Sequence, residues 1–196
     1  ALDHAGVHPE ELWGELAELG LFSTFVPEDA GGAGAGFLGH AITIEELARG
    51  GGIAGILPAA QGVAIDALLQ APNQDPAASR LEGLMTGEIL GAPALMEEDA
   101  GFVTTEAEGE GGDVVLVGRK ALVPWPGRAA LYVVRARRGE DVILVLVESG
   151  AAGLTHERGG PDLGLLGYET GDLVLAKTPG VVLGDASLLE RVWGGA

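Results

Sequence analysis

The first 87 residues carry apolar side chains at helical spacing. Leu12, Leu16 and Leu19, for example, share one face of a helix with 3.6 residues per turn. The pattern predicts helices at residues 7–20, 37–49 and 53–71, with a short extended piece at residues 22–26. Asp75 and Pro76 suit the N-cap and first turn of a fourth helix that ends near Gly87.

After Gly87 the pattern changes to alternation with a period of two, or to short continuous apolar runs. Such runs occupy residues 89–96, 102–107, 114–123, 131–136, 142–148 and 172–177. Glycine-bearing turns such as GEGGD and RRGED separate them, which is typical of a small antiparallel barrel or sandwich. Helical spacing returns at residues 186–193, with Asp185 as the expected N-cap.

These patterns predict an α+β chain in three parts. An N-terminal helical domain covers residues 1–88, a small antiparallel β-barrel or sandwich domain covers residues 89–184, and a further helical segment starts at residues 185–196. Because the last helix stops so soon after it begins, we expect the native gene to continue beyond Ala196.

Composition narrows the range of functions. The chain has 29 acidic and 11 basic residues and a formal net charge of −18, which disfavours binding to nucleic acid or to anionic lipid surfaces. It contains no cysteine, so disulfides, thiolate catalysis and Cys-based metal sites are excluded. A polyanionic ligand would have to be held by a few local arginines or helix N-termini against this overall field.

The most apolar stretch, residues 53–71, raises the question of a membrane span. It contains Pro58, Gln61 and Asp66, whereas a spanning helix needs about 20 uninterrupted apolar residues. We therefore predict a buried core helix and no membrane span. The N-terminal residues lack the features of a targeting signal, so a cytoplasmic location is expected.

Three motifs suggest a nucleotide site or a metal site, but a structural interpretation suits each of them better. Gly34, Gly36 and Gly39 match a dinucleotide-binding fingerprint, but no strand precedes them and no acidic residue follows at the required distance. His4 and His8 lack a third metal ligand. The acidic run at residues 97–99 lies on extended backbone that points successive side chains to opposite faces, so we predict a solvated turn, with one member structural, rather than a metal site.

Two segments have the pattern expected of a ligand-binding site. Residues 87–101, GEILGAPALMEEDAG, and residues 117–129, VGRKALVPWPGRA, both begin as apolar strands and then break into turns with glycine or proline. Two such strand ends, placed side by side, could present backbone amides to a bound molecule.

The order of motifs along the chain resembles the acyl-CoA dehydrogenase family. The carriers of the resemblance are ELWGELAELGLF, VPEDAGGAG, EELARG, the two segments above, and LGLLGYETGDLVL before VVLG. They correspond to the N-terminal helical domain and the middle β-domain of that family. The resemblance implies FAD as cofactor and an acyl-CoA thioester as substrate. The catalytic base of the family lies in a third, helical domain, so no catalytic residue is assigned in this chain.

The resemblance also implies which residues face the ligands. The cofactor-binding positions are Leu95, Met96, Glu97, Gly101, Val123, Pro124 and Trp125, and the substrate-binding positions are Phe102 and Tyr168. Several differ from the family pattern. Met96 and Pro124 replace residues that carry hydroxyl groups, Leu122 replaces a tryptophan, and Phe102 replaces a serine. In the last motif Leu166 and Tyr168 replace an arginine and a serine, and Thr170 is kept.

Proline at position 124 has neither a hydroxyl nor a backbone N–H to offer a flavin. We therefore expect a degenerate subunit that works with acyl-CoA and with other subunits of the family in a homo- or hetero-oligomer, its own FAD lost or shared with a partner. Two alternatives stay open. One is an active, FAD-containing dehydrogenase of fatty acid or steroid catabolism, and the other is a non-catalytic acyl-CoA-binding or scaffold protein.

Overall fold

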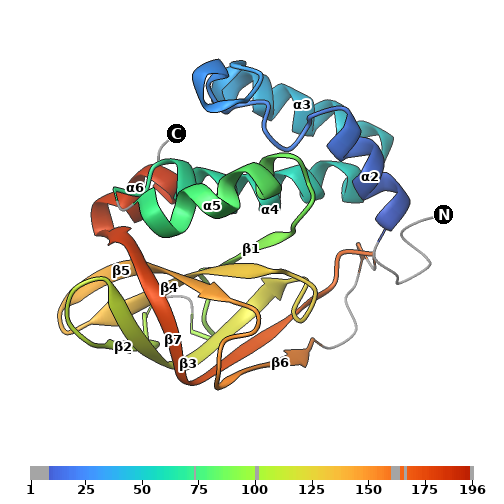
Figure 1. The fold of residues 1–196 in the computed structure, drawn as a ribbon. Helices are drawn as coiled ribbons and strands as arrows, with labels where there is room; N and C mark the ends of the chain where they lie inside the picture. The colour runs from blue at the N-terminus through green and yellow to red at the C-terminus, as the bar shows by residue number, and fades with distance from the viewer. Residues whose placement is uncertain (1–8, 73, 100–101, 160–163, 166, 195–196) are drawn as a thin grey trace.

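A computed structural model describes residues 9–72, 74–99, 102–159, 164–165 and 167–194. The chain forms a layer of helices above a β-barrel (Figure 1). The helices before the barrel are α2 (Glu10–Glu18), the short 3₁₀ helix η1 (Glu28–Ala30), α3 (Gly36–Gly50), α4 (Gly52–Leu69) and α5 (Gln74–Met85). The four predicted helices are therefore present.

Helix α4 is the centre of the helical layer. It packs against α3, α5 and the C-terminal helix α6 (Ala186–Gly194) and rests on strand β1 (Gly91–Ala94), so most of its side chains are buried although its length and composition would allow a membrane span. Buried Gln61 ties α4 to the barrel. Its amide nitrogen donates to the carbonyls of Leu84 and Ile89 at 2.9 and 3.0 Å, and its oxygen accepts from the Gly91 N–H at 2.9 Å. A buried amide needs hydrogen-bond partners, and the bond from Gly91 to Gln61 fixes where β1 begins.

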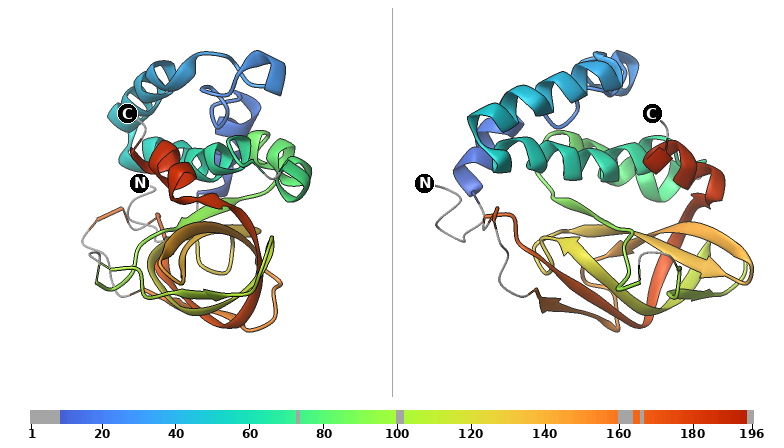
Figure 2. Two further views of the ribbon diagram at one scale, coloured as in Figure 1. Left: turned by 90° about the vertical axis from the view of Figure 1, so that its left-hand side faces the viewer. Right: turned by 180° about the vertical axis from the view of Figure 1, so that it is seen from behind.

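The barrel is a single seven-stranded sheet. Its other strands are β2 (Glu106–Glu108), β3 (Asp113–Pro124), β4 (Leu131–Arg138), β5 (Asp141–Glu148), β6 (Leu154–Arg158) and β7 (Thr170–Asp185). The order is β1-β4-β2-β3-β7-β5, β6 pairs with β7, and the β4–β5 pairing closes the ring seen end-on in Figure 2. The predicted α+β class with a barrel is confirmed. The sheet is mixed, because β1 and β2 both run parallel to β4 while the other pairs are antiparallel.

Some element boundaries differ from the sequence pattern. The predicted extended piece at residues 22–26 forms buried turns, because its amides bond locally, as in Val26 N–H to Ser23 C=O at 3.1 Å. Strand β6 was not predicted, since its sequence LTHER is polar and pairs only with β7. Strand β7 runs much further than residues 172–177, because Pro179 and Gly180 interrupt the apolar pattern without interrupting the pairing to β3.

The last helix, α6 (Ala186–Gly194), begins where the sequence predicts. The Asp185 carboxylate accepts the Ser187 N–H at 3.0 Å and its hydroxyl at 2.6 Å, which is the expected N-cap. These hydrogen bonds lower the pKa of Asp185. Helix α6 packs on α4 and β5. The division into domains at residues 88 and 184 stays a prediction.

Candidate functional site

The two segments that the sequence singles out lie side by side. The Ala121 N–H donates to the Met96 carbonyl at 3.0 Å, so the chain leaving β1 runs along the second half of β3. We call the region formed by residues 95–99 and 121–125 the cradle. Strand β1 brings the first segment from the helical layer, and β3 brings the second from the barrel wall.

A buried ion pair lies beneath the cradle. The Lys120 ammonium is fully buried and contacts the buried Glu97 carboxylate. That carboxylate also accepts from the Thr104 N–H and hydroxyl, both at 2.5 Å, and from the Thr105 N–H at 3.1 Å. Gly118 lets strand β3 lie close to Thr105, because a Cβ at position 118 would lie 2.7 Å from the Thr105 Cα. The pair therefore joins β3 to the turn that follows β1.

The environment of this pair changes both pKa values. Burial alone would raise the pKa of Glu97, but hydrogen bonds from Lys120, Thr104 and Thr105 outweigh burial and lower it to about 2. Burial lowers the pKa of Lys120 to about 8, although its contacts with Glu97 favour the charged form. Glu97 is thus a structural carboxylate, while Glu98 and Asp99 are exposed, in agreement with a solvated turn that has one structural member.

Lys120 was not among the residues predicted for the site. Strand β3 alternates inward and outward, with Val114, Leu116 and Lys120 on the inward side. A charged residue at an inward position requires a buried partner. The alternation along β3 could therefore have indicated that Lys120 has a buried acidic partner.

The backbone of the cradle is irregular where β3 ends. Leu122 and Trp125 adopt left-handed φ angles of 54° and 50°, which are uncommon for residues other than glycine. The β3–β7 register shifts between Lys120 and Val123, and this irregularity turns the Leu122 side chain outward, where it is 65% exposed. Val123 and Pro124 are buried.

Trp125 belongs to an aromatic cluster that connects the helices to the barrel. Its ring lies 5.9 Å from Trp13 of α2 and 5.5 Å from Tyr168, both edge-on, and Trp13 in turn contacts Phe22 at 4.3 Å. Trp125 is fully buried, and its backbone N–H donates to the Glu169 backbone carbonyl at 2.8 Å. Burial raises the pKa of Tyr168 to about 12, which keeps its phenol neutral.

The remaining predicted positions are dispersed around the cradle. Leu95 is buried in the core, and Met96 is partly exposed. Phe102 is 65% exposed, and its backbone N–H donates to the Asp99 carbonyl at 3.2 Å. Gly101 lies outside the described residues. A small cavity of about 320 Å³ lies beside the acidic turn and is lined by Glu97, Glu98, Asp99, Thr104 and Arg119.

Comparisons with known proteins agree with this architecture. Residues 1–88 match the family model for the acyl-CoA dehydrogenase N-terminal domain. The chain belongs to the acyl-CoA dehydrogenase family. An acyl-CoA dehydrogenase of Bacillus subtilis is 30% identical over 176 residues, which are 85% of this chain and 46% of the relative. The chain thus spans less than half the length of that curated relative.

Solved structures extend the similarity across the barrel. The Tcur3481-Tcur3483 steroid ACAD is 30% identical with a TM-score of 0.82, over 94% of this chain and 51% of that chain. An acyl-CoA dehydrogenase from Bacillus anthracis complexed with FAD is 26% identical with a TM-score of 0.81, over 93% of this chain and 34% of that chain. Membership of the acyl-CoA dehydrogenase family therefore implies FAD as the cofactor.

The cradle of this family member fits a flavin ring poorly. Pro124 carries no N–H and no hydroxyl. On either side of it, the N–H groups of Ala121 and Trp125 already donate to protein carbonyls, and the Lys120 ammonium already pairs with Glu97. A buried flavin atom left without a partner here would cost about 1–3 kcal/mol.

Proposed function

We propose that this protein is a subunit of an acyl-CoA dehydrogenase complex that keeps the family fold and completes a partner subunit's site, while binding FAD weakly or not at all. The observation that carries the proposal is Pro124, which lies in the cradle and offers no hydrogen-bond donor to a ring. The use of the Ala121 and Trp125 amides within the protein supports it.

The similar structures give the proposal a precedent. The steroid ACAD named above carries a two-part name, Tcur3481-Tcur3483, and resembles this chain over 94% of its length. We expect a comparable association here, with acyl-CoA bound where two subunits of the family meet. A homo-oligomer and a hetero-oligomer both agree with this expectation, and a cytoplasmic location stays a prediction.

Purification of the protein by itself tests the proposal. We expect a colourless preparation that reduces no dye acceptor with any acyl-CoA, because the cradle lacks donors for the flavin. Flavin content follows from the absorbance spectrum and from the fluorescence of flavin released on denaturation. A yellow preparation with one flavin per chain contradicts the proposal.

A gain-of-binding variant tests the role of the cradle directly. Pro124→Thr combined with Met96→Thr restores hydroxyl groups at two predicted flavin contacts, so FAD affinity should rise about tenfold, the effect of one or two net hydrogen bonds. The matched control is Pro126→Thr, which makes the same change at another buried proline that is not among the predicted contacts. Equal affinities in both variants would mean that position 124 does not face the ring.

A second candidate is an active, FAD-containing dehydrogenase. The hydrogen bond between residues 96 and 121 favours it, because it places the two predicted flavin-facing segments side by side. Flavin content separates the two candidates. A third candidate, an acyl-CoA-binding or scaffold protein, would bind acyl-CoA without flavin and without a partner subunit, and calorimetry with the isolated protein distinguishes it.

A further inference from the structure

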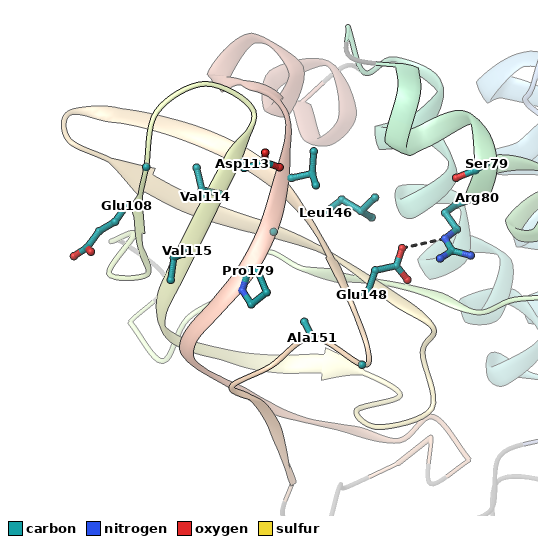
Figure 3. Close-up of a pocket in the computed structure, with 14 residues that line it drawn as sticks. Ser79, Arg80, Glu108, Asp113, Val114, Val115, Leu146, Glu148, Ala151 and Pro179 are labelled. Carbon is teal, nitrogen blue, oxygen red and sulfur yellow. Dashed lines mark hydrogen bonds and ion pairs between the residues drawn. The ribbon is translucent and has the colours of Figure 1, made fainter.

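A cavity of about 890 Å³ lies at the beginning of β3, away from the cradle (Figure 3). From Val115 to Ala121 the strand runs about 20 Å, so this cavity and the cradle are separate sites. Helix α5 forms one side, and strands β2, β3, β5 and β7 form the rest. We call this cavity the groove and define it by Arg80, Asp113, Val115, Glu148 and Pro179.

The lining of the groove is mainly apolar. Val115 points outward from β3 and is 38% exposed, and Pro179 is exposed beside it on β7. Leu146, Ala151 and Val181 continue the same surface. Both the volume and the apolar lining are those of sites for small molecules, which often lie where two structural layers meet.

Charges stand at the two ends of the groove. At one end the Arg80 side chain of α5 donates to the Glu148 carboxylate at 3.0 Å, so this guanidinium is already compensated (Figure 3). At the other end Asp113 and Glu108 flank the β2–β3 turn, and within the described part of the chain neither carboxylate forms an ion pair. The Glu108 carboxylate points away from the groove in Figure 3, so it adds negative potential near the groove without contacting a ligand there.

We propose that the groove binds a small apolar molecule that carries a positive charge, of the alkylammonium class. The apolar body would cover Val115 and Pro179, and the cation would lie near Asp113. An anionic ligand is disfavoured, because Arg80 is compensated and the formal net charge of the chain is −18. The same field opposes a second copy of this chain as the occupant.

Calorimetry with three probes of equal chain length tests the proposal. Octylammonium, octanol and octanoate share one apolar body and differ in charge. We expect octylammonium to bind at least about threefold more tightly than octanol, the scale of one partly exposed ion pair, and octanoate to bind most weakly. Equal binding of the three probes, or no binding of octylammonium, overturns the proposal.

Variants locate the site. Val115→Phe fills the groove and should weaken octylammonium binding about tenfold, whereas Val117→Phe, at the next outward and exposed position of β3, should leave it unchanged. Asp113→Asn should weaken binding about threefold. Glu110→Gln makes the same change of charge at an exposed residue that does not line the groove, and it should have no such effect. Equal losses in either matched pair would overturn the assignment of the groove.

Discussion

The two ends of strand β3 satisfy their polar groups in different ways. At the cradle end, Lys120 and Glu97 are buried against each other, and backbone amides around Pro124 donate to protein carbonyls. At the groove end, Asp113 is exposed and Val115 faces outward. One strand therefore carries an internally satisfied end and an end that leaves apolar surface and charge available.

This difference means that the two ends of one strand offer different groups to a ligand. Contacts within the protein, the Glu97–Lys120 pair and the Trp125 cluster, support the backbone of the cradle. Binding of a flavin ring there would need hydrogen-bond donors, and Pro124 supplies none. The following substitutions test how much each end of β3 contributes to the free energy of unfolding.

Lys120→Ala should have the largest effect. Removal of the ammonium leaves the Glu97 charge buried without its partner, and a broken buried pair costs about 3–5 kcal/mol in the free energy of unfolding. Arg119→Ala is the matched control, because Arg119 is the adjacent residue and pairs on the surface with Glu157 at 2.6 Å. The control should cost less than about 1 kcal/mol. Urea denaturation measures both, and similar losses would contradict the distinction.

The pH dependence of stability should report the same carboxylate. The pKa of Glu97 is lowered from 4.5 to about 2, so its stabilisation is fully present above pH 4.5 and is lost as the pH falls through about 2. This contribution is roughly 3 kcal/mol. Lys120, with a pKa of about 8, stays protonated throughout this interval.

Urea denaturation across this interval should give a smaller slope of unfolding free energy against pH for Glu97→Gln than for the unmodified protein. The variant is less stable at neutral pH, so the slopes are compared rather than the absolute values. Glu98→Gln is the matched control, since Glu98 is exposed at the next position, and its slope should remain unchanged. Identical slopes in all three proteins would contradict a paired Glu97.

Glycine substitutions at the two ends of β3 should have small effects of opposite sign. Leu122 is exposed and holds a φ of 54°, so Leu122→Gly should stabilise the protein by about 1 kcal/mol through relief of backbone strain. Val115 has ordinary strand geometry, and Val115→Gly should destabilise by a similar amount. Thermal denaturation distinguishes the two signs. A destabilising Leu122→Gly would mean that this side chain stabilises the fold in ways its exposure does not reveal.

Much of the fold could be predicted from periodicity. All four predicted N-terminal helices, the barrel strands β3, β4 and β5, and the Asp185 N-cap follow from local pattern. Strand β6 could not be predicted, because an edge strand with a polar sequence gives no apolar alternation. The parallel pairing of β1 with β4 also lay beyond the pattern, since alternation says which side chains share a face but not which strand lies beside them.

For the site, the sequence indicated the two segments, and their adjacency is observed. It did not indicate that Trp125 would pack between Trp13 and Tyr168, because those three residues are distant along the chain. The assignment of residues to cofactor and substrate stays a prediction.

The sequence by itself determined the N-terminal helices, most of the barrel strands and the absence of a donor at position 124, because these follow from local spacing and from the chemistry of single residues. Only the tertiary structure decided that Glu97 turns inward to Lys120, that the Ala121 and Trp125 amides are already used, and that an apolar groove opens at the far end of β3. Each of these depends on groups brought together from distant parts of the chain, and burial fixes such partners through desolvation, which local pattern does not encode.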